Sequence, residues 1–346
     1  MSILRGVCFR IHRIIKLDLT FSGFSEKYRT IQNSPNLLNF VLTFCAILIK
    51  HRNLSICRNF IIEFKNCRLS AKPEFMNDSA FPSIDVLYVV EQKDFIFLEN
   101  SIRNLLKYSL NPIGNIYFVA PSKQMTILNN MLDIIFDFLN KNHIGWRIIS
   151  EDDVVPLETR DKLRENFVSR YGWVLQQFAT VYFVYEGKFS NSERIFALDA
   201  DTIITDYMCF VNKKNKQILC RTSEYNSPYY DLIRKLDSNL CKKRESFIAH
   251  QMLYQVSFMK DIFSRISIFS LADLVDFVIK NFERSSNSPI CIEFEIYAQG
   301  MRFFHNDFIE ILKFSNLGIS RASFIDDFDI SEYEGVYNSI SMHSYS

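Results

Sequence analysis

The sequence predicts an α/β fold with a mainly parallel, Rossmann-like sheet flanked by helices. Short β-rich apolar runs alternate with longer segments whose apolar residues recur at helical spacing. Such alternation is typical of βαβ units and a parallel sheet. In addition, two aspartates, Asp199 and Asp201, directly follow one of the apolar runs. Ligands of such sheets bind beyond the carboxyl ends of the strands, where this pair is expected to lie.

The first predicted strand covers residues 84–90, Ile-Asp-Val-Leu-Tyr-Val-Val, and a helix is expected over 95–108. Asp94 stands where a helix N-cap is expected. The alternation continues with helices over 122–140, 157–167 and 171–182 and with strands over 115–120, 146–149 and 194–198.

Three segments are predicted: a helical N-terminal appendage over 1–80, the α/β domain over 81–310 and a C-terminal tail over 311–346. Residues 1–80 carry 12 Lys plus Arg against 5 Asp plus Glu, a net charge of +7, and the remainder carries 28 against 34, or −6. Such a basic, apolar segment suits peripheral contact with the inner membrane face, and equally a solvated helical surface. The longest apolar run, 37–49, is shorter than the roughly 20 residues that span a bilayer.

The composition excludes some classes of protein. A net charge of +1 gives no footprint for nucleic acid. The 33 phenylalanines are typical of a large apolar core. The 8 cysteines show neither a Cys-x-x-Cys pair nor zinc-ligand spacing, which favours a reducing, cytoplasmic location. No signal peptide is recognisable at the start of the chain.

The sequence Asp199-Ala200-Asp201 is the strongest indication of chemistry. Side chains at positions i and i+2 of an extended segment point the same way, so both carboxylates can converge on one hard cation. Mg²⁺ or Mn²⁺ held in this way keeps positions open for diphosphate oxygens. Such a cation offsets the charge that develops on a leaving diphosphate.

Residues 196–202, Phe-Ala-Leu-Asp-Ala-Asp-Thr, resemble the DXD strand and loop of GT-A glycosyltransferases. The order of four motifs is also similar to a bacterial family of DXD-containing glycosyltransferase-like proteins, over about residues 84–305. The motifs are a Lys-Asp pair at 93–94, Gly-Trp-x-x-Gln-Gln at 172–177, a His-containing segment at 247–252 and a Ser-Glu-Tyr-Glu-like box at 292–297. Ile292 and Phe294 stand where that family has serine and tyrosine.

The resemblance implies a GT-A-like fold, a divalent metal held by Asp199 and Asp201, and a nucleotide-sugar donor. It implies an acceptor that is a glycan or a lipid-linked glycan, in the synthesis of cell-surface polysaccharide. The nucleotide-sugar contacts it implies are Val90, Lys93, Asp94, Asp199 and Ala200.

The helix that carries Trp173, Gln176 and Gln177 is expected to contact sugar, together with Tyr297. Trp173 and Gln177 are four residues apart and share a face. An indole can stack on a pyranose ring and amides can bind sugar hydroxyls. The alternative is a buried tryptophan with polar neighbours.

Glu293, Glu295 and His250 are the candidates for the catalytic base that takes the proton from an acceptor hydroxyl. If the box at 292–297 is helical, the two glutamates diverge by about 200° and only one can face the site. If the box is extended, both face one way. His250 is expected to end a β-like segment and to precede a helix; a lone histidine also serves as a structural residue.

Two other classes of protein remain open. A haloacid-dehalogenase-like phosphatase also has Asp-x-Asp at a strand end, with the first Asp as nucleophile. Its motif usually lies near the start of the domain and has Thr or Val two residues after the second Asp, where Ile203 stands here. A non-catalytic interaction protein, or one that binds a sugar nucleotide without turnover, is the other alternative.

Overall fold

The computed structural model describes residues 80–224, 226–242, 245–282, 290, 292–321 and 329–343. The predicted N-terminal appendage, apart from Ala80, lies outside the described residues, and so does the apolar run at 37–49. No helix in the described part of the chain is long and apolar enough to cross a membrane.

The central sheet has five strands in the order β3-β2-β1-β4-β7. Its first four strands run parallel and β7 runs antiparallel to β4. The strands are β1 (Ile84–Val89), β2 (Ile113–Ala120), β3 (Gly145–Ser150), β4 (Arg194–Leu198) and β7 (Gln251–Gln255). The predicted α/β class with a mainly parallel sheet is confirmed.

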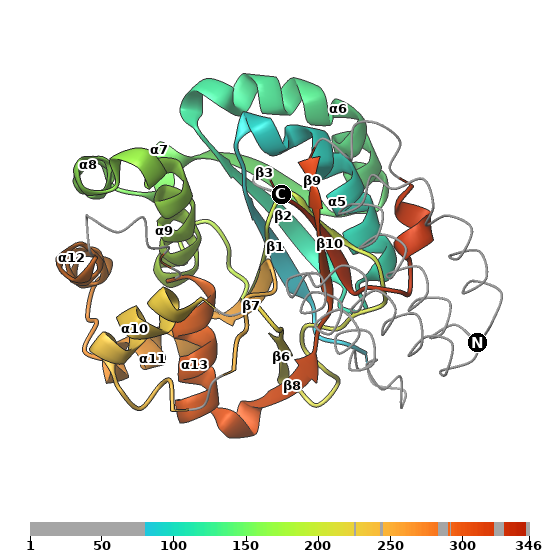
Figure 1. The fold of residues 1–346 in the computed structure, drawn as a ribbon. Helices are drawn as coiled ribbons and strands as arrows, with labels where there is room; N and C mark the ends of the chain where they lie inside the picture. Colours follow the sequence, from blue (N-terminus) through green and yellow to red (C-terminus); the bar gives the residue numbers. More distant parts are fainter. Residues whose placement is uncertain are drawn as a thin grey trace, which may run out of the picture.

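Helices cover both faces of this sheet (Figure 1) because side chains alternate along each strand. Val86 and Tyr88 of β1 pack in the core under α5 (Phe95–Tyr108) and α6 (Met125–Lys141), whereas Leu87 packs in the core on the opposite face. The helices on that opposite face include α8 (Leu157–Asn166), α9 (Tyr171–Glu186), α10 (Ser227–Leu236), α11 (Val256–Arg265), α12 (Leu271–Asn281) and α13 (Phe294–Phe304). The short helix α7 (Glu151–Val154) follows β3.

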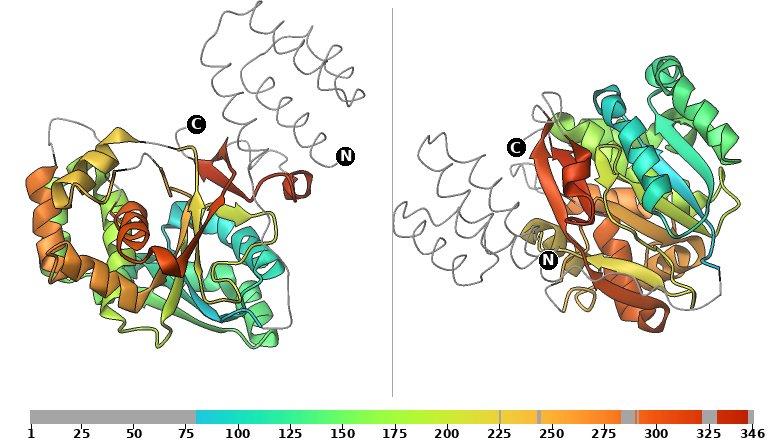
Figure 2. Two further views of the ribbon diagram at one scale, coloured as in Figure 1. Left: turned by 90° about the horizontal axis from the view of Figure 1, so that it is seen from below. Right: turned by 90° about the vertical axis from the view of Figure 1, so that its right-hand side faces the viewer.

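Two small sheets flank the central one. β5 (Thr202–Ile204) pairs antiparallel with β10 (Ser339–His343), which pairs parallel with β9 (Asn316–Ser320). β6 (Gln217–Arg221) pairs with β8 (Ile309–Lys313). The predicted boundary at residue 310 therefore falls inside β8, and the segment expected as a tail forms the red strands seen in Figure 2. Leu317, Ile319 and Ile340 of these strands share a core cluster with Phe97 of α5.

Asp94 occupies the N-cap position of α5, as expected, although its side chain makes no capping hydrogen bond. One local expectation was wrong. His250 is followed by strand β7 rather than a helix, because residues 251–255 complete the sheet beside β4. Sequence periodicity alone does not separate a short buried strand from part of a buried helix.

Candidate active site

The turn Asp199-Ala200-Asp201 joins β4 to β5 at the carboxyl edge of the central sheet. The Asp199 amide donates to the carbonyl of His250 at 3.0 Å, and the Met342 amide donates to the carbonyl of Asp201 at 2.9 Å. Ala200 is buried. The turn is thereby fixed to the start of β7 on one side and to β10 on the other, which holds the two carboxylates in place.

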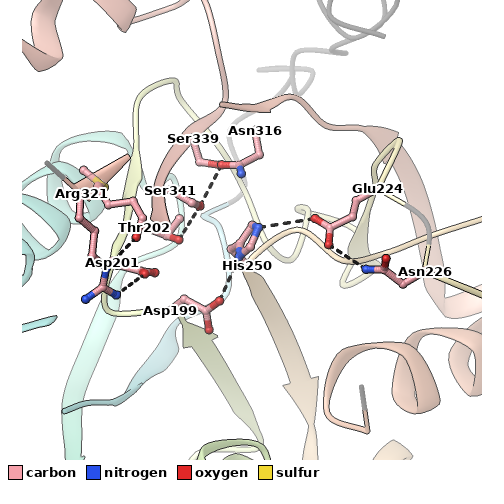
Figure 3. A network of polar contacts seen from close by, with 11 residues as sticks. Asp199, Asp201, Thr202, Glu224, Asn226, His250, Asn316, Arg321, Ser339 and Ser341 are labelled. Carbon is pink, nitrogen blue, oxygen red and sulfur yellow. Dashed lines mark hydrogen bonds and ion pairs between the residues drawn. The ribbon is translucent and has the colours of Figure 1, made fainter. Parts of the chain in front are cut away.

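His250 lies beside this turn and faces two carboxylates (Figure 3). Its Nδ1 is 3.1 Å from Oδ2 of Asp199, and its Nε2 is 3.7 Å from Oε2 of Glu224. Its φ is 56°, in the left-handed region that residues other than glycine rarely adopt. Burial opposes the charged ring, but the bond to Asp199 and the surrounding acids prevail and raise the pKa of His250 to about 9. The neighbouring acids thus favour the protonated ring.

Asp201 and Asp94 share one arginine, Arg321. The Arg321 Nη2 donates to Oδ2 of Asp201 at 2.9 Å and also to Oδ1 of Asp94. Burial, with the charges of Asp199 and Asp94, raises the pKa of Asp201 to about 6. Burial also raises the pKa of Asp94, and Arg321 only partly opposes this effect. In the folded chain, Asp201 of the Asp-x-Asp motif therefore belongs to a cluster with Asp94 and Arg321.

A cavity of about 860 Å³ opens beside Asp199 and His250. Its wall combines segments far apart in the chain: the loop after β1, the start of α9, the segment before α10, and the residues at the start of α13. The charged and aromatic lining residues include Glu91, Lys93, Arg170, Trp173, Glu224, Tyr229 and Glu293. The cavity is large enough for a nucleotide sugar or part of a glycan.

Only one of the two predicted glutamates lines this cavity. The box at 292–297 leads into α13, and Glu293 precedes the first helical residue, Phe294. Burial first, and then the charge of Asp199, raises the pKa of Glu293. Glu295 points into the core, where its oxygens accept hydrogen bonds from four donors: Tyr230 Oη, Ser246 Oγ, the Phe247 amide and Gln299 Nε2.

The predicted sugar contacts separate in the same way. Trp173 lines the cavity with 36% of its surface exposed, and the Arg170 guanidinium lies 5.5 Å from its ring centroid. Gln177 borders the cavity, but its amide is used by the chain: Nε2 donates to the carbonyl of Ile290, and Oε1 accepts from the Ile292 amide at 2.9 Å. Gln177 therefore holds the segment that leads to Glu293.

Gln176 and Tyr297 are not among the residues that line the cavity. Gln176 is half-buried, and its carbonyl accepts from Thr180. The Tyr297 hydroxyl donates to Oε1 of Gln217 at 2.8 Å and accepts from the Gln255 amide at 2.9 Å. These contacts place Tyr297 in the core beneath β7.

The residues expected to contact the nucleotide follow β1. Val90 is buried, and its amide donates to the carbonyl of Val119. Lys93 lines the cavity with its ammonium 2.7 Å from Oε2 of Glu91. Its carbonyl accepts from Nη1 of Arg321, so the loop after β1 and the Asp-x-Asp turn share one guanidinium.

The carboxylates present fit a divalent cation whose coordination is completed by oxygens of a bound diphosphate and of water. Asp199 and Asp201 offer the hard oxygens that Mg²⁺ and Mn²⁺ prefer. Burial first, and then the charge of Asp199, raises the pKa of both Asp201 and Glu293, so a bound cation would favour their ionised forms. Across the described ranges, no three His, Cys, Asp or Glu side chains are grouped to hold a metal by themselves. Two carboxylates with diphosphate oxygens and water are, however, a usual environment for Mg²⁺.

Sequence reasoning missed Arg321 and Glu224. Neither belongs to a local motif, and each is separated by more than 20 residues from the acids or the histidine it faces. Arg321 follows β9, in the segment expected to be a tail. No strand was expected in that segment, so the sequence offered no signal for Arg321.

The fold is similar to several solved sugar transferases. Mouse xyloside xylosyltransferase 1 in its apo form shows 12% identity and a TM-score of 0.44, over 76% of this chain and 98% of that chain. The mannosyltransferase Ktr4p from S. cerevisiae in complex with GDP shows 12% identity and a TM-score of 0.47, over 73% of this chain and 77% of that chain. An active-site mutant of LgtC shows 10% identity and a TM-score of 0.37, over 76% and 88%.

No protein-family model matches the sequence, and no curated protein matches it. Structural similarities of this size describe the path of the chain and carry no conclusion about its reaction.

Proposed function

We propose that this protein is a divalent-metal-dependent glycosyltransferase that moves a sugar from a nucleoside-diphosphate sugar to a glycan or lipid-linked acceptor. The observation that carries the proposal is the meeting of Asp199, His250 and Glu293 at one cavity beyond the carboxyl edge of a parallel sheet. The four motifs resembling a bacterial glycosyltransferase-like family support the same class and a role in cell-surface polysaccharide synthesis.

Asp199 and Asp201 would hold Mn²⁺ or Mg²⁺, and the bound cation would offset charge on the departing nucleoside diphosphate. A diphosphate alone would meet the carboxylates of Asp199, Glu224 and Glu293, which repel it. Lys93 and Asp94, with the backbone of Val90 and Ala200, are proposed on the nucleoside side. Trp173 is proposed to stack on a sugar ring, since its indole is exposed in the cavity wall.

Glu293 is the proposed base. It takes the proton of the acceptor hydroxyl as the acceptor oxygen bonds to the anomeric carbon and the bond to the diphosphate oxygen breaks. The electron pair of that bond leaves with the nucleoside diphosphate. A raised pKa makes the ionised Glu293 a stronger base than an ordinary carboxylate. His250, whose Nδ1 lies 3.1 Å from Oδ2 of Asp199, is proposed to orient that carboxylate instead. A single displacement of this kind inverts the anomeric configuration.

The test is calorimetric titration of UDP, GDP and CMP into the full chain, with and without Mn²⁺. We expect one nucleotide to bind only with Mn²⁺, and Asp201→Asn to weaken that binding by about tenfold or more. Asp153→Asn, which removes an exposed acid of α7, is the matched control and should bind as the wild type does.

A folded wild-type protein that binds none of the three nucleotides would contradict the proposal. Release of phosphate from phosphomonoesters would favour the phosphatase alternative. That reaction needs Asp199 as nucleophile, although its Oδ2 faces the His250 ring.

A further inference from the structure

The guanidinium of Arg321 is engaged on every side. Its Nε donates to the carbonyl of Met342 at 3.1 Å, and its Nη1 donates to the carbonyl of Lys93 at 3.2 Å. Its Nη2 donates to the carboxylates of both Asp94 and Asp201. Its side chain is only 19% exposed. Figure 3 shows it reaching Asp201 from the side opposite His250. One fixed cation therefore links the loop after β1, the Asp-x-Asp turn and β10.

This guanidinium occupies one oxygen of a carboxylate that is proposed to hold the metal. The Oδ2 of Asp201 accepts from Arg321, and a carboxylate oxygen bound to guanidinium is a poorer ligand for a second cation. Arg321 and a divalent ion consequently compete for Asp201. Binding of the ion requires either that they share this carboxylate or that Arg321 finds another anion.

An incoming diphosphate is such an anion. The planar fork of a guanidinium matches phosphate oxygens as well as it matches carboxylate oxygens. Arg321 also binds the carbonyl of Lys93, a residue of the cavity wall, so its guanidinium lies between Asp201 and the loop proposed to contact the nucleotide. In this exchange the cation would neutralise Asp201 and the guanidinium would neutralise phosphate, while Asp94 would give up its bond to Arg321.

We propose that Arg321 is a charge-exchange residue. It pairs with Asp94 and Asp201 in the empty site, and on donor binding it moves to the diphosphate and leaves Asp201 to the metal. The identity of the diphosphate ligand rests on the proposed function, whereas the competition between Arg321 and a cation rests on the geometry of the described residues.

The experiment measures binding of Mn²⁺ alone, and separately of UDP or GDP at saturating Mn²⁺, to the full chain. For Arg321→Gln we expect Mn²⁺ to bind on the order of tenfold tighter, because the charged hydrogen bond that competes for Asp201 is gone. We expect the nucleotide to bind on the order of tenfold more weakly, because the charged hydrogen bond to its phosphate is lost. A purely structural role for Arg321 would weaken both.

Lys93→Gln is the matched control, because it removes an equal charge from the loop that Arg321 contacts without touching Asp201. We expect it to change Mn²⁺ affinity by less than about threefold, as screening of an exposed charge dictates. Equal tightening in Lys93→Gln and Arg321→Gln would overturn the exchange and leave only a general effect of charge.

Arg321→Lys keeps the proposal testable if Arg321→Gln does not fold. Lysine keeps the charge but lacks the fork, so nucleotide binding should fall while Mn²⁺ affinity stays at or above that of the wild type. Weaker Mn²⁺ binding in either folded variant, or no Mn²⁺ binding to any variant, would overturn the proposal. A wild type that binds Mn²⁺ but no nucleotide would refute the proposed function, and the Mn²⁺ comparison would still decide the competition.

Discussion

Glu293 and Glu295 are two positions apart, yet they belong to two different regions of the molecule. Glu295 lies in the core between α10 and α13, where its carboxylate accepts hydrogen bonds from four neutral donors. Glu293 lies at the cavity, where Thr180 is its hydrogen-bond partner and the charges of Asp199 and His250 act on it.

The difference teaches how to separate a structural acid from a reactive one. Burial raises the pKa of both glutamates. The core surrounds Glu295 with donors that fix its direction, whereas the cavity leaves Glu293 facing space that a ligand can fill. An acid of the first kind contributes to stability, and an acid of the second kind is available for proton transfer.

The largest expected effect is on catalysis at the cavity. Glu293→Gln should lower the rate of sugar transfer by about 10²- to 10⁴-fold, the usual contribution of a general base, while nucleotide binding is retained. The measurement is the transfer rate with the nucleotide identified by calorimetry, using Glu295→Gln as the control. A rate within about threefold of wild type would remove Glu293 from the mechanism.

A second effect, on folding, should appear in the core. Glu295→Gln places an amide NH₂ among groups that donate hydrogen bonds, and we expect it to lower the free energy of unfolding by about 1–3 kcal/mol. The transfer rate of the folded fraction should not change. Urea unfolding followed by tryptophan fluorescence provides the measurement. Unchanged stability would mean that the four donors do not depend on the charge of Glu295.

The smallest expected effect is the pH dependence of stability that arises from Glu293. Because the folded-state pKa of Glu293 lies above the ordinary value of 4.5, the folded protein holds this proton more tightly than the unfolded chain. The resulting contribution to stability is complete below pH 4.5 and is lost as the pH rises through the folded-state pKa. Glu293→Gln removes this loss, so the variant should become more stable relative to wild type as pH increases.

Thermal melts of wild type and Glu293→Gln from pH 5 to pH 9 would measure the trend. Asp199 and His250 are the charged groups that act on Glu293, and neither is altered in this variant. A stability difference that is independent of pH would show that Glu293 is ionised equally in both states.

The fold was predictable because its signals are local. The helix expected over 95–108 and the strand over 194–198 match α5 and β4 residue for residue. Each has its apolar residues at the period of its own secondary structure. β9 and β10 were missed because they are short strands of a small sheet, with serine and asparagine side chains bonded to each other between them.

The sequence by itself determined the α/β class, the Asp-x-Asp turn at a strand end and the set of acids among which a base is found, since all three follow from neighbouring residues. Only the tertiary structure decided which acids meet. It turned Glu293 to the cavity and Glu295 to the core, used Gln177 and Tyr297 in internal hydrogen bonds, and brought Arg321 to Asp201 across 120 positions. The reason is physical: side-chain direction and long-range contacts depend on how helices and strands pack, and no local pattern carries that information.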